Sequence, residues 1–413
     1  MTNNQIAAST GPARVQDRGE HPKAPRAPGA PSAWVHGFAH QRFAAARDAF
    51  AANLASGEDV GASFCATVEG ETVVDLWGGY ADEARTRPWE KDTIVNVYST
   101  TKTMAALTAL VLADRGKLDI DAPVATYWPE FAANGKQAIK ISHLMSHSSG
   151  LSGWREPFTG SDLYDAQRAA RLLAAQAPLW APGTASGYHV YTFGFLLGEV
   201  VRRITGKTLG TVFREEIAEP LEADFWIGLP ASEDRRVADL IPMPQPTSFE
   251  VSQVPDIMRI SLHDTQAGDA PMTRTREWRA AEIASVNGHG NARSIAEIHS
   301  ILANGGVARG KRFISEGGCR RAQEQQIEGP DLVMMGMQAR FGLGFGLAPC
   351  QILQITPPNP DTLFWGGGGG SLILIDSQAR TTMAFAMNRL QRGFLGDERS
   401  FRIIREMWKA LAR

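Results

Sequence analysis

Ser99 and Lys102 have side chains of complementary chemistry and stand three positions apart in the segment VYSTTK. On a helix this spacing places a hydroxyl and an amine one turn apart on the same face, where the amine can take the hydroxyl proton. An almost wholly apolar stretch follows as far as Gly116 and predicts a buried helix, whose start favours both an oxyanion and a neutral lysine. The pair is therefore a candidate nucleophile and base; alternatively, Ser99 caps the helix and Lys102 reaches solvent.

Strand-like segments gather at the two ends of the chain, whereas the middle is helical in pattern. Two β-rich runs, 60–68 and 71–77, are separated by Glu69 and Gly70 and predict a tight antiparallel hairpin. Further expected strands span 341–347, 372–375 and 381–387, and expected helices span 34–53, 166–175, 190–204, 294–303 and 398–412. We predict an α/β protein of the α+β type: an antiparallel sheet flanked by helices, built from the N- and C-terminal segments, with an inserted, mainly helical domain.

This pattern also predicts where the parts of the chain begin and end. Residues 1–33 are polar and proline-rich, which is typical of a flexible N-terminal tail. We expect the sheet domain to comprise residues 34–98 and 285–413, and the helical domain to comprise residues 99–284. Within the latter, segment 241–278 carries five prolines and little periodicity, so it is either a lid over a cleft or a plain surface excursion.

Composition excludes several classes of function. The chain has 413 residues, 43% of them hydrophobic and 21% charged, as in ordinary globular proteins. Its 42 basic and 44 acidic side chains give a formal charge of -2, so nothing global favours nucleic acid or anionic lipid as a partner. No apolar run approaches the roughly 20 residues that span a bilayer, and no secretory signal is evident. We expect a cytoplasmic protein with no nucleic-acid or membrane partner; its oligomeric state stays open.

Four motifs occur in one order along the chain: STTK from Ser99, HLMSHSSGL from His143, WAPGTASGYHVYTFGFLLGEVVRRITG from Trp180, and WGGGGGS from Trp365. Together they resemble the serine β-lactamase-like superfamily, the fold of class C β-lactamases and penicillin-binding proteins. Within it the chain is most similar to the family VIII carboxylesterases. The resemblance covers roughly residues 34–410, and four ordered motifs are far more specific than the Ser-x-x-Lys pair alone.

The resemblance implies roles for three residues. Ser99 would be the acylated nucleophile, Lys102 would assist its deprotonation, and Tyr188 would share protons with Lys102 beside the nucleophile. A phenol with a pKa of about 10 is a poor base at neutral pH unless a nearby cation stabilises the phenolate, which a lysine could do. Whether Lys102 or Tyr188 is the base in acylation therefore remains open.

The last motif departs from the β-lactamase pattern. Where those enzymes and the carboxypeptidases have Lys-Thr-Gly, this chain reads Trp365-Gly366-Gly367. An indole supplies an apolar wall and one N–H donor in place of a cation, which favours a neutral substrate. The resemblance further implies that the amide of Gly368 joins that of Ser99 as the oxyanion hole, although five consecutive glycines leave this register uncertain by one residue.

Other residues are weaker candidates. His143 and His147 are four apart, but no third ligand is evident, so we expect structural histidines and no metal. His189 stands beside Tyr188, where an imidazole could tune the phenol. Composition alone suggests an apolar substrate wall, whose further candidate members are Trp154, Trp180 and Phe249.

These observations favour a serine hydrolase that cleaves short-chain or hydrophobic carboxylic esters through an acyl-enzyme on Ser99, with weak β-lactam hydrolysis as a side reaction. A small-molecule ester is the expected substrate, and the mechanism requires no cofactor. One alternative is an amide, peptide or β-lactam hydrolase, or an acyltransferase, that uses the same Ser-Lys-Tyr site. The other is a non-catalytic binding or scaffold protein of the same fold.

Overall fold

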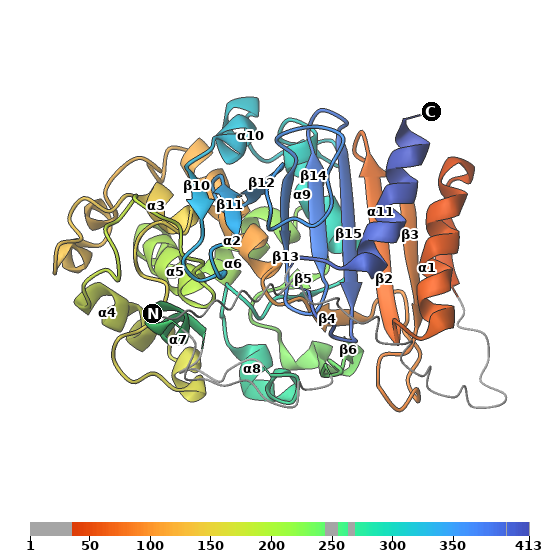
Figure 1. Cartoon of the computed structure of the whole chain (residues 1–413), viewed down its shortest axis with the longest axis horizontal. Helices are drawn as coiled ribbons and strands as arrows, with labels where there is room; N and C mark the ends of the chain where they lie inside the picture. The colour runs from red at the N-terminus through yellow and green to blue at the C-terminus, as the bar shows by residue number, and fades with distance from the viewer. Residues whose placement is uncertain (1–34, 244–254, 263–268, 394, 413) are drawn as a thin grey trace, which may run out of the picture. The chain divides into compact units, whose positions relative to one another are not determined.

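A nine-stranded antiparallel sheet organises the computed structural model, which describes residues 35–243, 255–262, 269–393 and 395–412. The strands run in the order β1-β3-β2-β15-β14-β13-β12-β11-β10 (Figure 1). Their bounds are β1 Val35–Ala39, β2 Gly61–Val68, β3 Glu71–Gly79, β10 Ile327–Pro330, β11 Gln338–Phe341, β12 Gly346–Leu347, β13 Leu363–Gly366, β14 Leu372–Asp376 and β15 Thr381–Met387. The first and last parts of the chain thus meet where β2 pairs with β15.

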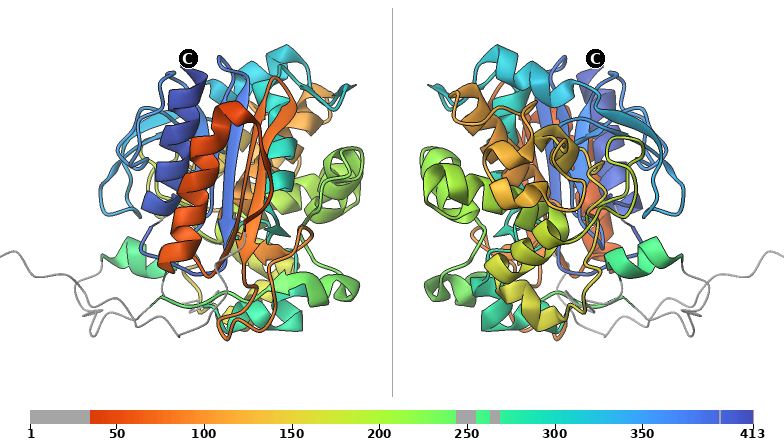
Figure 2. Two further views of the ribbon diagram at one scale, coloured as in Figure 1. Left: turned by 90° about the vertical axis from the view of Figure 1, so that its right-hand side faces the viewer. Right: turned by 90° about the vertical axis from the view of Figure 1, so that its left-hand side faces the viewer.

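Helices cover both faces of this sheet. The helices α1 (Ala44–Ser56) and α11 (Glu398–Leu411) pack on each other along one face, as the left view of Figure 2 shows, and α9 (Ala292–Ala303) packs on β2, β14 and β15 from the other. Strands β14 and β15 are consequently buried at every residue, which explains their continuous apolar runs.

The segment between β3 and α9 forms a mainly helical layer beside the sheet (Figure 1). Its helices are α2 Thr101–Asp114, α3 Ile141–Met145, α4 Ala166–Ala175, α5 Thr192–Thr205, α6 Leu209–Phe213, α7 Asp256–Leu262 and α8 Arg276–Ala280. A small sheet contains, in this order, β5 Phe225–Trp226, β7 His289–Gly290, β4 Ile94–Asn96 and β6 Val237–Ala238. The β8–β9 hairpin (Val307–Ala308, Lys311–Arg312) and α10 Glu316–Gln323 follow α9 in the chain. The predicted architecture is confirmed.

Two predicted elements were wrong in part. The expected helix 34–53 begins only at α1, because Val35–Ala39 is an edge strand that pairs with β3. There Phe38 is 44% exposed and does not continue the apolar face of the helix. The expected strand 341–347 is two short strands, β11 and β12, joined through Gly344, whose φ of 86° breaks the extended chain. Residues 1–34 lie outside the described chain, and the proposed domain boundaries remain predictions.

Candidate active site

The nucleophile candidate Ser99 lies in a tight turn that connects the small sheet to α2. Tyr98 adopts a left-handed φ of 43°, an uncommon conformation for a bulky residue and one typical of functional turns. The turn is braced by Thr101 Oγ1, which donates to Tyr98 O and accepts from Gly288 N at 2.8 Å. No side-chain cap closes α2, so the alternative in which Ser99 merely caps the helix does not hold. Ser99 is 9% exposed at the start of this buried helix.

Lys102 is buried inside the molecule rather than directed to solvent, with 1% of its surface exposed. Its Nζ lies 3.2 Å from Ser99 Oγ, 2.7 Å from Val190 O and 3.0 Å from Ser285 O. Burial lowers the pKa of the amine well below its usual value. A neutral amine has two N–H donors and one lone pair. The two carbonyls take the donors, which leaves the lone pair to accept the Ser99 hydroxyl proton.

Tyr188 contacts both Ser99 and Lys102. Its hydroxyl is hydrogen-bonded to Ser99 and accepts the indole N–H of Trp365 at 3.3 Å, and its ring face lies 4.8 Å from Lys102 Nζ. Burial raises the pKa of the phenol above its usual value of 10.0, an effect that those two hydrogen bonds reduce only in part. The surroundings therefore favour a neutral phenol beside a neutral amine, rather than the phenolate and ammonium pair considered from the sequence.

Trp365 differs from the expectation that it forms a substrate wall. Its side chain is 1% exposed, packs within an aromatic cluster of His147, Tyr188, Phe341 and Phe364, and directs its N–H to Tyr188. The sequence could not show this, because the direction of a strand side chain depends on the register of the sheet. In this structure Trp365 supports the phenol and presents no free surface.

The glycine run after β13 packs directly on the Ser99 turn. A Cβ added to Gly367 would lie 2.1 Å from Val97 O, 2.6 Å from Ser371 Oγ and 3.1 Å from Ser99 N, whereas one added to Gly368 would meet nothing. Gly366 is also crowded, by Ser371 O. Among the described residues, neither the Ser99 amide nor the Gly368 amide donates a hydrogen bond. This arrangement favours the register in which Gly368 is the second oxyanion donor.

We predict that Gly367→Ala impairs both folding and activity. The added methyl group would clash with Val97 O, so the turn must move away from Ser99, at a cost of about 1 to 3 kcal/mol in unfolding free energy. We expect kcat for a short-chain ester to fall by roughly 10- to 1000-fold, because one oxyanion donor is displaced. Gly317→Ala in α10, where a Cβ has its nearest contact at 3.5 Å, is the matched control for steady-state kinetics and urea unfolding. If Gly367→Ala and Gly317→Ala have the same kcat and the same unfolding free energy, the packing of Gly367 on Val97 O does not position the Ser99 turn.

The histidines serve the structure around Tyr188. His147 is buried with a φ of 59°; its Nδ1 accepts from His189 N at 3.2 Å, and its ring contacts Tyr188 edge-on at 4.9 Å. His189 donates Nδ1–H to Gly187 O at 2.6 Å and accepts from Ser149 at 2.7 Å, so its ring does not reach the phenol oxygen. His143 is half-buried in the middle of α3, where its Nδ1 accepts from Lys140 N at 3.3 Å. Within the described ranges, no group of three metal-ligating side chains comes together.

Trp154 and Trp180 pack against other segments of the helical layer and form no hydrogen bond or ring contact with Ser99, Lys102 or Tyr188. Trp154 is 3% exposed, stacks on Phe158 at 3.7 Å and donates to Ala169 O, all in the helical layer. Trp180 donates to Ala185 O at 2.9 Å and packs against Gly187, the residue before Tyr188. Phe249 lies outside the described residues, as do 244–254 and 263–268 of the expected lid. Composition suggested these aromatics, but it does not distinguish a wall from a core.

Sequence reasoning missed Asp331, which holds the Tyr188 segment from the other end of the chain. Asp331 is fully buried, and its Oδ1 accepts from the amides of Tyr188 at 3.1 Å, Val333 at 2.9 Å and Met334 at 2.9 Å. Leu332 N also donates to Ser186 O at 2.9 Å. A lone aspartate before the apolar stretch LVMMGM was the available signal, and nothing local tied it to Tyr188.

We predict that Asp331→Ala costs about 2 to 4 kcal/mol of unfolding free energy, because three amides lose a charged acceptor in a buried site. Asp331→Asn keeps an oxygen at that position and should lose clearly less. Chemical denaturation of the two variants measures the difference. If Asp331→Ala is as stable as the wild type, the carboxylate does not hold the Tyr188 segment in place.

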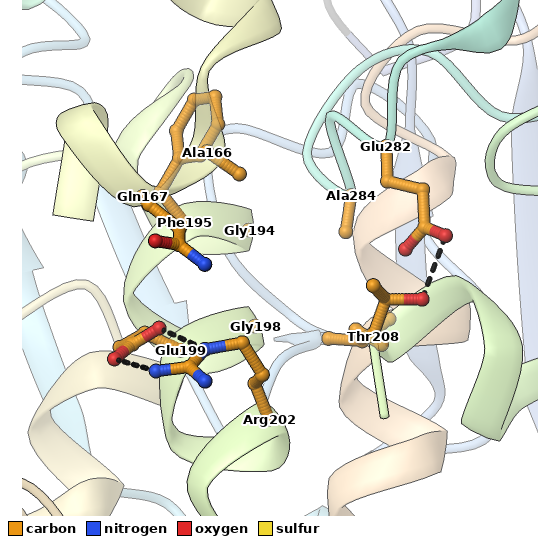
Figure 3. Close-up of a pocket in the computed structure, with 11 residues that line it drawn as sticks. Ala166, Gln167, Gly194, Phe195, Gly198, Glu199, Arg202, Thr208, Glu282 and Ala284 are labelled. Atoms are coloured by element: carbon orange, nitrogen blue, oxygen red, sulfur yellow. Dashed lines mark hydrogen bonds and ion pairs between the residues drawn. The ribbon is translucent and has the colours of Figure 1, made fainter. Parts of the chain in front are cut away.

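One hollow in the structure is lined by none of Ser99, Lys102 and Tyr188. It opens between α4, α5 and α6 and the 282–284 segment (Figure 3), with Gly194 and Ala284 on its wall. Its carboxylates already have partners: Glu199 binds Arg202 at 2.8 Å, and Glu282 accepts from Thr208 at 2.7 Å. We therefore assign the chemistry by the geometry of Ser99, Lys102 and Tyr188, and not by this hollow.

The fold and these three side chains define a serine hydrolase of the β-lactamase type. The Beta-lactamase family model matches residues 46–405, and the chain belongs to that family. The chain is 36% identical to "Esterase/beta-lactamase LipL" of Mycobacterium tuberculosis, over 86% of this chain and 83% of that one. It is 29% identical to "Esterase EstB" of Burkholderia gladioli, over 82% and 88%.

A solved structure gives the same result. The crystal structure of a family VIII carboxylesterase superposes with a TM-score of 0.86 at 43% identity, covering 91% of this chain and 100% of that one. The predicted membership of the serine β-lactamase-like superfamily is confirmed. In the part of the chain that the structure describes, no helix has the length and apolar character needed to cross a bilayer.

Proposed function

We propose that this protein is a carboxylesterase that forms an acyl-enzyme on Ser99 and prefers neutral, short-chain or hydrophobic esters. The observation that carries the proposal is the contact of Ser99 Oγ with a buried amine, 3.2 Å away, whose pKa burial lowers. Such an amine can accept the hydroxyl proton at neutral pH. The names of LipL and EstB, both called esterases, support the ester class of substrate.

In this mechanism Ser99 passes its proton to Lys102 as Oγ attacks the ester carbonyl. The carbonyl oxygen becomes an oxyanion that the amides of Ser99 and Gly368 bind. When the intermediate collapses, Tyr188 gives its proton to the leaving alkoxide, and the Lys102 ammonium replaces it. Water then attacks the acyl-enzyme by the same route, releases the acid and returns the proton to Ser99. The raised phenol pKa keeps Tyr188 protonated and so able to donate, and the lowered amine pKa favours the neutral form of Lys102 that can accept a proton.

The preference for a neutral substrate rests on Trp365. It occupies the place where the β-lactamases and carboxypeptidases that the sequence resembles have a lysine, and here an indole meets the Tyr188 hydroxyl instead. A substrate carboxylate would therefore lack that cation. Weak β-lactam turnover is compatible with the site, and the name of LipL includes that activity for that protein.

The test is a substrate profile of the purified protein. We expect hydrolysis of p-nitrophenyl esters between acetate and octanoate to exceed nitrocefin hydrolysis by orders of magnitude, with a mass increment of one acyl group on the Ser99 peptide after rapid quenching. Efficient nitrocefin turnover with poor ester turnover would overturn the substrate class. Failure of a fluorophosphonate to label the protein would favour the non-catalytic alternative.

A further inference from the structure

Arg399, from the first turn of α11, is a buried cation in contact with the glycine turn. It is 2% exposed, and each of its five guanidinium N–H groups has an acceptor. Nε donates to Asp397 Oδ1 at 3.0 Å, and Nη1 donates to Asp59 Oδ1 at 2.7 Å and to Arg389 O at 2.8 Å. Nη2 donates to Asp397 Oδ2 at 2.7 Å and to Gly369 O at 2.8 Å. Burying an ion pair of this kind gives little net stability, so its presence needs another explanation.

The hydrogen bond from Arg399 Nη2 to Gly369 O helps to set the orientation of the peptide planes in the glycine turn. Gly369 O also accepts from Gln391 N at 3.0 Å, so two donors fix the peptide plane between Gly369 and Gly370. The N–H of that same plane, on Gly370, donates to Gly367 O at 3.1 Å. This second bond fixes the plane between Gly367 and Gly368, and the N–H of that plane is the Gly368 amide.

Glycine peptides need such an anchor. Gly369 and Gly370 have φ values of 90° and 129°. Glycine populates positive and negative φ about equally, so the backbone alone does not hold these two residues in one conformation. The guanidinium leaves no room for a larger residue, since a Cβ on Gly370 would lie 2.5 Å from Arg399 Nη2 and from Asp397 Oδ2. Gly369 N is held as well, by Gly393 O at 3.0 Å.

We propose that the buried Asp59–Arg399–Asp397 cluster is a positioning device for the oxyanion hole, which sets the direction of the Gly368 N–H through two peptide planes. This proposal rests on the proposed function, because it assumes that Gly368 binds the oxyanion. Arg399 touches no reacting atom and is a positioning residue. Only a guanidinium suits this place, since a lysine has three donors for the five acceptors.

The test compares Arg399→Lys with Arg402→Lys, the same substitution on the same helix. Arg402 donates to Asn53 Oδ1 at 2.9 Å and does not contact the glycine turn. For Arg399→Lys we expect kcat for p-nitrophenyl butyrate to fall on the order of 10- to 100-fold, with KM changed less than about threefold. Affinity for phenylboronic acid, whose hydroxyl mimics the oxyanion, should fall with kcat. Arg402→Lys should stay within about twofold of the wild type in both measurements.

Hydrogen exchange separates this proposal from the proposed function. The amides of the peptide that covers 366–371 should exchange faster in Arg399→Lys, and not in Arg402→Lys, whether or not the wild type cleaves esters. Unchanged exchange together with unchanged kcat and boronate affinity would overturn the positioning role. A wild type that neither cleaves esters nor binds boronate would overturn the proposed function alone.

A second variant covers the case in which Arg399→Lys does not fold. Asp59→Asn keeps an oxygen for Nη1 and removes one charge, so we expect the same changes in kcat, boronate affinity and exchange at a few-fold size. If Asp59→Asn leaves all three measurements at the wild-type value, the cluster does not position the turn.

Discussion

Ser99→Ala is expected to lower kcat for p-nitrophenyl esters by roughly 10⁴-fold or more, because the variant has no atom with which to form the acyl-enzyme. The same substitution should leave the unfolding free energy within about 1 kcal/mol of the wild type. Ser99 Oγ makes its contacts with Lys102 and Tyr188, and both keep further partners, namely the carbonyls of Val190 and Ser285 for the amine and the Trp365 indole for the phenol. Steady-state hydrolysis and thermal unfolding on one preparation measure both effects.

Ser300→Ala is the matched control for this experiment. Ser300 is a buried serine in α9 that donates to Glu297 O at 2.7 Å, away from the Ser99 turn, so its loss should leave kcat unchanged. Substrate protection from the fluorophosphonate should be seen in the wild type and in Ser300→Ala, whereas Ser99→Ala should take no label. Ester turnover that survives in Ser99→Ala would show that another residue is the nucleophile.

Several helices and strands could be predicted from the sequence because they depend on interactions between residues that are close together in the chain. The hairpin at 61–79 follows from a two-residue turn, and the α2 segment follows from the apolar run 104–113, which comes directly after the Ser99–Lys102 segment. The sheet formed from both chain ends followed from where the β-rich runs lie. The edge strand β1 was missed, since it has no apolar alternation of its own and is defined by its hydrogen bonds to β3.

The parts of the site that the sequence could not predict depend on contacts between distant segments. Asp331 acts on Tyr188 across 143 positions, and Arg399 acts on Gly369 across 30. Neither residue has a local motif, because a buried charge is recognised only by the groups that surround it. The indole of Trp365 turns toward Tyr188 and away from solvent, a direction that depends on the pairing of β13 with β14 and not on the local sequence.

The second large effect is expected at Lys102, where Lys102→Met should lower kcat by roughly 10²- to 10⁴-fold through loss of the general base. Methionine has a similar length and no lone-pair nitrogen, and it leaves the carbonyls of Val190 and Ser285 without this donor. The variant Lys102→Arg separates the two roles of the amine, which are donating hydrogen bonds to the two carbonyls and accepting the proton of Ser99. A guanidinium can donate to both carbonyls but does not lose its proton, so activity should be lost in this variant as well.

The pH profile gives the sharper test of Lys102 because its sign is fixed by the mechanism. Catalysis requires the neutral amine, so kcat/KM should be low below the pKa of Lys102, rise as the amine loses its proton, and stay high above it. Burial lowers that pKa well below the usual lysine value of 10.5, so the rise should occur at a pH well below 10.5. The pKa of Tyr188 is raised above 10.0, so the phenol should not limit activity on the alkaline side below that pH.

Neither His147 nor His189 accounts for the expected rise of kcat/KM with pH. Burial lowers the pKa of His189 to about 4 and that of His147 well below its usual value, and neither imidazole reaches Ser99 Oγ by a hydrogen bond among the described residues. In Lys102→Met the residual activity should lack the acidic limb of the wild type. A residual profile with that limb unchanged would assign the titration to another group, and full activity in Lys102→Arg would exclude Lys102 as the base.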